Sequence, residues 1–183
     1  YDPNVLDELL YLRPTSVKGM WRWWARALIA GVLHDRGNLE EKKVVDYVSR
    51  VMGLGSTSES SSYKISVLVR RKPEASKGLQ RLQRHRLLSL SRGSRPRFVE
   101  GGRFSLRVDV VRRKRGNEAA LWSLLLALTL SGLGKGARRG LGCVDIIALR
   151  SSGLKIDLRA RDVSSVAELV EKAYESSRRL VLG

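Results

Sequence analysis

Cysteine and histidine are scarce in this chain of 183 residues. Cys143 is the only cysteine, and His34 and His85 are the only histidines. A single cysteine cannot form an internal disulfide, which agrees with a reducing compartment. Neither histidine is accompanied by a cysteine or an acidic cluster, and no spacing suggests a nucleophile with its base and carboxylate. The sequence therefore predicts no metal, no cofactor and no catalytic residue.

Long apolar runs are absent as well. No stretch approaches the roughly 18 residues that a membrane-spanning helix needs, and no secretory signal precedes Tyr1. Apolar residues nevertheless make up 43% of the chain, which suffices for the core of one ordinary domain. We therefore expect a globular, cytoplasmic protein that has no membrane partner and no small-molecule substrate.

Acidic residues are fewer than basic ones, and most of the imbalance lies in one segment of the chain. The chain has 35 lysines and arginines against 18 acids, which gives a net charge of +17. Residues 63–115 hold 17 of these cations, and their only acids are Glu74, Glu100 and Asp109. Arginine outnumbers lysine 25 to 10, which favours bidentate contacts with phosphate and stacking on bases. Such an excess predicts a polyanionic partner, because solubility alone needs far less charge.

A tryptophan-rich helix is predicted near the start of the chain. Pro14 favours an extended conformation at Arg13, and Thr15 or Ser16 can then begin a helix that runs to about Leu33. Its spacing separates two faces. The apolar face consists of Val17, Met20, Trp21, Trp24, Leu28 and Val32, and the basic row consists of Lys18, Arg22 and Arg26.

The other elements follow from periodicity and from turn residues. Asn38 with Glu41 resembles a capping box that opens a short second helix ending at Gly53. Alternating side chains predict strands, and a spacing of three to four predicts helices. The expected order is a serine-rich linker over 55–62, a strand over 65–69, a basic insertion over about 71–102, a strand over 104–110, an apolar helix over 119–130, a strand over 144–148, a hairpin strand over 154–158, and a helix opened by Ser165 with Glu168 and continuing to Leu180.

The most distinctive stretch is the glycine-rich segment 131–144, which directly follows the apolar helix. Glycine lacks the Cβ that keeps ligands away from backbone N–H groups, so glycines interspersed with cations suit a phosphate chain. A nucleotide-binding P-loop is disfavoured, because Lys135 is followed by Gly136 where serine or threonine is needed. The candidate phosphate-contacting residues are Gly132, Gly134, Lys135, Gly136, Arg138, Arg139, Gly140 and Gly142.

Three of these features have a plainer interpretation that the sequence leaves open. Trp23 lies beside Arg26 on the helix surface and would offer a stacking face there, but tryptophans are mostly buried and a core position is an alternative. The basic row is either a binding surface or a solvated face. The glycines with Arg138 and Arg139 form either a binding loop or a tight turn with a solvated tip.

The order helix, strand, strand, helix, strand is that of a ferredoxin-like α+β fold without its first strand, which we expect upstream of Tyr1. Four strings resemble the RAMP superfamily, and within it the first-numbered RAMP subunits of the Cmr effector, the type III-B CRISPR complex. The strings are YDPN at 1–4, LRPTSVKGMWRWWARAL at 12–28, MGLGS at 52–56 and RRGLGCV at 138–144. The string at 12–28 is the most specific, whereas the glycine loop is shared by the whole superfamily.

The resemblance implies a ferredoxin-like (RRM-like) RNA-binding domain over residues 1–150, with an antiparallel sheet that carries its helices on one face. Residues 151–183 would supply a hairpin strand and a helix, and would open a second such unit. The implied function is non-catalytic binding of guide or target RNA, near the end distal to the repeat tag, in an antiviral complex with other Cmr subunits. Matching the family's basic helix and loop, the RNA-binding residues would be Arg13, Lys18, Arg22 and Arg26 with the loop residues named above, and Trp23 would add stacking.

Two other functions stay open. A metal-independent RAMP endoribonuclease that matures guide RNA would use a general acid and base, for which His85 in the string RLQRHRLL is the candidate. A generic RNA-binding or ribosome-associated protein is the third possibility. It would lack the string of residues 13–26.

Overall fold

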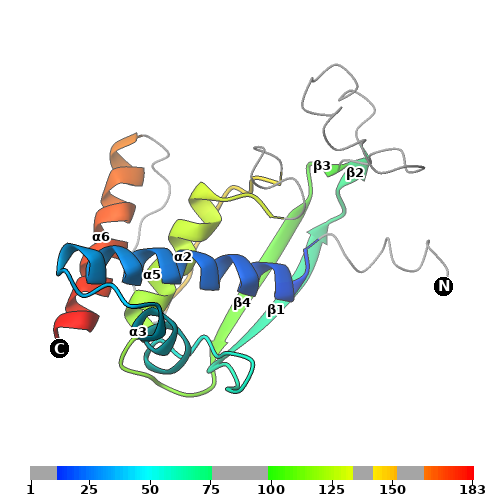
Figure 1. The fold of residues 1–183 in the computed structure, drawn as a ribbon. Coiled ribbons are helices and arrows are strands. Elements are labelled where there is room, and N and C mark those ends of the chain that lie inside the picture. The colour runs from blue at the N-terminus through cyan, green and yellow to red at the C-terminus, as the bar shows by residue number, and fades with distance from the viewer. Residues whose placement is uncertain (1–11, 76–98, 134–141, 152–162) are drawn as a thin grey trace, which may run out of the picture. The chain divides into compact units, whose positions relative to one another are not determined.

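The computed structural model describes residues 12–75, 99–133, 142–151 and 163–183. Contacts divide the chain into two compact units, and each is described by itself. One unit comprises Tyr1–Pro14 and Ile65–Arg107, and the other comprises Thr15–Lys64 and Val108–Gly183. Most of the strand residues belong to the first unit, and the helices belong to the second (Figure 1). The α+β class therefore agrees with the prediction.

The second unit is built around α2 (Pro14–Asp35), the predicted tryptophan-rich helix. Proline suits its first position, because the missing N–H would have no partner within the helix there. Trp21 is fully buried, and its indole Nε1 donates hydrogen bonds to the Ala120 carbonyl at 2.6 Å and the Ser123 hydroxyl at 3.0 Å. Its ring also lies 4.7 Å from that of Tyr63. This one side chain therefore joins α2 to the helix that carries Ala120 and Ser123.

That helix is α5 (Asn117–Leu130), and it is buried on nearly all sides, as its uniformly apolar sequence predicts. Figure 1 shows α2 crossing α5. The last helix, α6 (Val163–Leu182), packs on α5 within the same unit and buries Leu169, Ala173 and Leu180. The amphipathic helix is thus confirmed. Whether residues 151–183 open a second RAMP unit stays a prediction.

Both predicted helix starts that used a capping pair were wrong. The short helix α3 (Glu41–Asp46) has Glu40 as its N-cap with no side-chain cap bond, and the Asn38 amide oxygen instead accepts a hydrogen bond from Lys43 at 2.7 Å. The α6 helix begins two residues before Ser165, so its Glu168 is free to bind Lys172 one turn later. In each case a lysine binds a side chain that the capping box would have used: Lys43 donates a hydrogen bond to Asn38, and Lys172 forms an ion pair with Glu168.

The chain between α3 and the first strand is ordered by backbone hydrogen bonds. A π-helical turn, η1 (Tyr47–Val51), follows α3, and Gly53 ends it with a positive φ of 77°, as predicted. The serine-rich stretch 55–62 is a structured turn rather than a linker. The Ser62 amide donates to the Gly53 carbonyl at 2.7 Å, and the Arg50 side chain binds Glu59 at 2.8 Å.

The strands of the first unit are where alternation predicted them. The strands β1 (Tyr63–Arg71) and β4 (Arg103–Val110) pair as one two-stranded sheet. At the base of the basic insertion, β2 (Glu74–Ala75) and β3 (Val99–Glu100) pair antiparallel, with Glu74 opposite Glu100. Residues 76–98, which include His85, lie outside the described residues.

The strand predicted over 144–148 is wrong. In the described residues 142–151 the backbone makes one isolated bridge, from Gly132 to Cys143, and then runs without strand pairing. Ile146 and Leu149 nevertheless pack on a core cluster made by α2, α5 and α6. Of the alternating apolar residues, Val144 and Ile146 are half-buried and Ala148 is exposed, so partial burial occurs here without strand pairing. The predicted hairpin strand over 154–158 lies outside the described residues.

Candidate nucleic-acid interface

The basic row of α2 lies on one side of the helix, and its three charges act on one another. Burial lowers the pKa of Lys18, and the neighbouring charge of Arg22 lowers it further. Burial likewise lowers the pKa of Arg22, with the charge of Arg26 adding to the effect. The described structure records no acidic partner for any of these three side chains. This unrelieved repulsion makes the row a favourable place for an anion.

Arg22 differs from its two neighbours because it also holds the fold together. Its Nε and one terminal nitrogen donate to the Leu54 carbonyl at 3.0 and 2.8 Å. Leu54 is fully buried between Gly53 and Gly55, both of which have positive φ. A Cβ at Gly55 would lie 2.6 Å from the Glu59 carbonyl oxygen, so glycine is needed to form this turn. The MGLGS string therefore presents a buried carbonyl to the basic helix.

Arg22→Ala should destabilise the protein by about 1–3 kcal/mol, because the Leu54 carbonyl loses both donors in a buried position. Arg26→Ala is the matched control. Arg26 lies one helical turn after Arg22 and its side chain is exposed. Its replacement removes the same charge and should change the free energy of unfolding by less than about 0.5 kcal/mol. Urea unfolding of the two variants measures the difference. Equal stabilities would show that the Arg22 contact contributes nothing.

Two adjacent tryptophans of α2 differ in exposure and in contacts. Trp23 is 63% exposed, so its surface position is correct and the core alternative is not. Its ring meets that of Trp24 edge-on, with centroids 5.3 Å apart and planes at 81°. Trp24 is half-buried, packs on the core cluster and donates its Nε1 hydrogen to the Ser131 hydroxyl. Trp24 thereby fixes the helix surface from which Trp23 projects.

Ser131 is the first residue of the glycine-rich segment, so its bond to Trp24 ties the base of the loop to α2. Gly132 pairs with Cys143, and the Leu133 amide donates to the Gly142 carbonyl at 2.8 Å, which brings the two ends of the loop together. Gly142 has a φ of 73°, and a Cβ there would clash with the Leu133 carbonyl oxygen. Glycine at 142 is therefore required by the closure of the loop.

The predicted site residues thus fall into four groups. Lys18, Arg26 and Trp23 are presented by α2, with Lys18 half-buried and the other two exposed. Arg22 donates hydrogen bonds to the Leu54 carbonyl, and Arg13 is exposed immediately before the helix. Gly132 and Gly142 form the closed base of the loop. The predicted loop residues outside the described ranges are Gly134, Lys135, Gly136, Arg138, Arg139 and Gly140.

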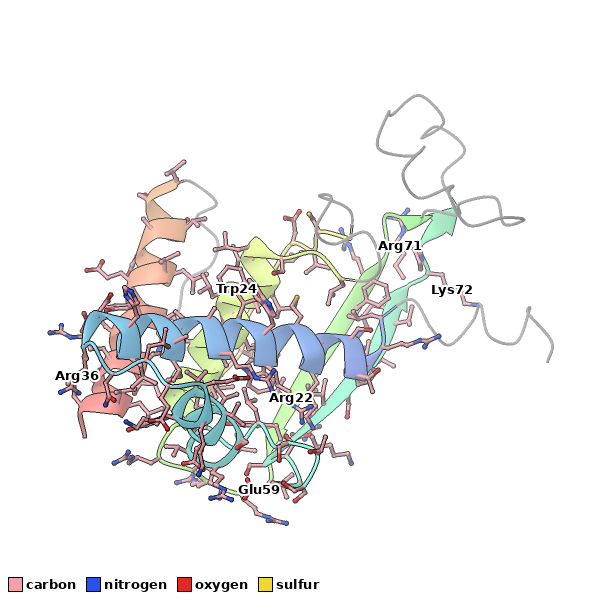
Figure 2. The ribbon with its side chains drawn as sticks, viewed as in Figure 1. Arg22, Trp24, Arg36, Glu59, Arg71 and Lys72 are labelled. Atoms are coloured by element: carbon pink, nitrogen blue, oxygen red, sulfur yellow. The ribbon has the colours of Figure 1, made fainter. Side chains whose placement is uncertain are left out.

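Figure 2 shows that Trp24 and Arg22, which bind Ser131 and the Leu54 carbonyl, lie on different sides of α2. Trp24 points to the side of the helix where α5 ends, and Arg22 points to the opposite side, toward the chain that carries Leu54. The sequence missed Ser131 and the Leu54 carbonyl as partners. Ser131 could have been suspected, because it follows the apolar helix directly and Trp24 needs an acceptor for its N–H when half-buried.

Other kinds of site find little support among the described residues. His34 is exposed and lies 3.6 Å from Asp35, at the far end of α2 from the basic row. No group of three or more histidine, cysteine, aspartate or glutamate side chains there is arranged to hold a metal ion. None of the described helices is both long and apolar enough to span a bilayer.

Two comparisons, one by sequence profile and one by structure, found proteins similar to this chain. A sequence profile of the RAMP superfamily matches residues 2–145. Among solved structures, the chain is similar to the apo crystal structure of Cmr1 from Pyrococcus furiosus, with a TM-score of 0.65 and 22% sequence identity. The match covers 98% of this chain but 56% of that one, so the chain spans about half the length of its structural relative. A search of curated proteins found no match.

Proposed function

Because the chain belongs to the RAMP superfamily, we propose that it is an RNA-binding subunit of a Cmr complex, the type III-B CRISPR effector. In this proposal it holds single-stranded guide or target RNA near the end distal to the repeat tag, and does not cleave it. Other Cmr subunits are its protein partners. The motif string of residues 12–28 and the fold shared with Cmr1 support the assignment to this complex.

The bond between Trp24 and Ser131 is the observation that carries the RNA-binding proposal. It joins α2, the helix that carries the exposed Trp23 and the basic row, to the root of a glycine loop that holds Lys135, Arg138 and Arg139 in sequence. A row of cations follows the backbone of a single strand, and an aromatic ring stacks on any base, so this combination binds RNA with little sequence preference. Phosphates would also relieve the mutual repulsion of Lys18, Arg22 and Arg26.

The binding proposal is tested with a labelled single-stranded RNA and fluorescence anisotropy, in buffer that contains EDTA. The expected result is salt-dependent binding with the RNA recovered intact. No binding at low salt would refute the proposal. Cleavage at one site that is lost in His85→Ala would replace it with the endoribonuclease function.

Membership of the complex needs a separate experiment, because RNA binding alone does not identify the assembly. Affinity purification of the full-length protein from its native host is expected to recover guide RNA together with other Cmr subunits. Recovery of ribosomes or of bulk cellular RNA in their place would favour a generic RNA-binding protein.

A further inference from the structure

The two-stranded sheet of the first unit has one polar and one apolar face. Successive side chains of a strand point to opposite faces, so residues two apart share a face. The Arg70 Nε donates to the Ser105 hydroxyl at 2.8 Å, which places these two side chains on the same face of the β1–β4 sheet. Alternation from these two residues puts Phe104 and Leu106 on the other face. The part of the polar face called the arginine face below consists of Ser66, Leu68, Arg70, Arg103, Ser105 and Arg107, and the same face continues to Lys64 and Asp109.

All three arginines of the arginine face are exposed, and so is 54% of Leu68. Asp109, the next same-face position of β4 after Arg107, is the only acid in either strand. The arginines therefore exceed the acids by two even when Asp109 is counted. Such an excess of charge on a solvent-facing sheet fits a polyanion better than a neutral or basic partner.

The spacing of the arginines indicates an extended ligand. Arg103 and Arg107 are four residues apart on one strand, about 13 Å at the usual rise per residue. Arg70 reaches from the neighbouring strand to Ser105, which lies midway between them. The bond to Ser105 uses only Nε of Arg70, and within the described residues its terminal nitrogens have no recorded partner. Three guanidinium groups spread in this way meet successive phosphates of a chain more readily than one small anion.

We propose that the arginine face is a second RNA-binding surface, which contacts the phosphates of a single strand through Arg70, Arg103 and Arg107. Leu68 supplies an apolar contact for a base or ribose between them. The proposal rests on the proposed RNA-binding function but uses residues that the α2 and glycine-loop interface does not contain. It also gives a role to part of the cation excess of residues 63–115, which that interface leaves unexplained.

Arg70→Gln/Arg103→Gln tests this surface, with Arg112→Gln/Arg113→Gln as a control that removes the same charge from an exposed turn after β4. Affinity for a single-stranded uridine-rich RNA is measured by anisotropy between about 50 and 200 mM salt. Each lost phosphate contact lowers the slope of log K against log salt by about 0.7 for a single strand, so the face variant should lose about 1.4 from that slope. The control should keep the wild-type slope, and circular dichroism should be unchanged in both.

A third variant, Lys18→Gln/Arg26→Gln, separates the two interfaces. If it weakens binding while the face variant behaves like the control, the arginine face is not an RNA site and the α2 interface stands. If only the face variant weakens binding, the arginine face is supported and the α2 interface is refuted. If wild-type protein binds no RNA, the proposed function fails and this surface fails with it.

Discussion

Trp23→Ala is expected to lower RNA affinity about tenfold or more without lowering the melting temperature. The Trp23 ring is 63% exposed and makes its recorded ring contact only with the edge of Trp24, so its removal leaves the described core intact. A base stacked on an aromatic side chain contributes about 1–3 kcal/mol, and 1.4 kcal/mol corresponds to a factor of ten. Anisotropy titration measures the affinity, and thermal unfolding measures the stability.

Trp23→Phe is the matched control for stacking. It retains an aromatic face at the same position and should keep most of the affinity that alanine loses. If Trp23→Ala binds RNA as tightly as the wild type, the exposed ring is not a stacking platform. A clear fall in melting temperature would instead give Trp23 a structural role.

The double variant Arg138→Ala/Arg139→Ala should bind RNA more weakly and with a flatter salt dependence. Two lost phosphate contacts lower the salt slope for single-stranded RNA by about 1.4, which corresponds to roughly tenfold weaker binding near physiological salt. The effect should exceed that of Arg112→Ala/Arg113→Ala, which removes the same charge elsewhere. The described ends of the loop are closed by backbone bonds of Gly132, Leu133 and Gly142, so the double variant should unfold like the wild type.

An unchanged salt slope in Arg138→Ala/Arg139→Ala would contradict the assignment of the loop to RNA phosphates. An equal loss in the control variant would show that net charge, rather than the position of these arginines, governs binding. Both outcomes would leave the stacking role of Trp23 open to its own test.

The sequence predicted a helix or strand correctly where its hydrophobic pattern was uniform along the whole element. The spacing of apolar residues in α2, the alternation in β4 and the uniformly apolar sequence of α5 each gave the correct element. The patterns of α2 and β4 are strongly periodic, whereas α5 was predicted from an apolar run too long for an ordinary strand. The predicted strand over 144–148 failed because Ile146 is half-buried against helices and its backbone does not pair with another strand.

The contacts that define the interface could not be predicted in the same way. Trp24 and Ser131 are 107 residues apart in the sequence, and only the packing of α2 on α5 brings them together. The sequence also treats Arg22 as the equal of Lys18 and Arg26. Its bond to Leu54 depends on the direction of one backbone carbonyl, which the positive φ of Gly53 and Gly55 determines.

The most direct test of the α2 and glycine-loop interface is photocrosslinking of the wild-type protein to single-stranded RNA, followed by mass spectrometry of the crosslinked peptides. The account predicts RNA adducts on the peptide that carries Trp23 and on peptides from residues 131–144. Adducts confined to other parts of the chain, with none on α2 or on the loop, would contradict it.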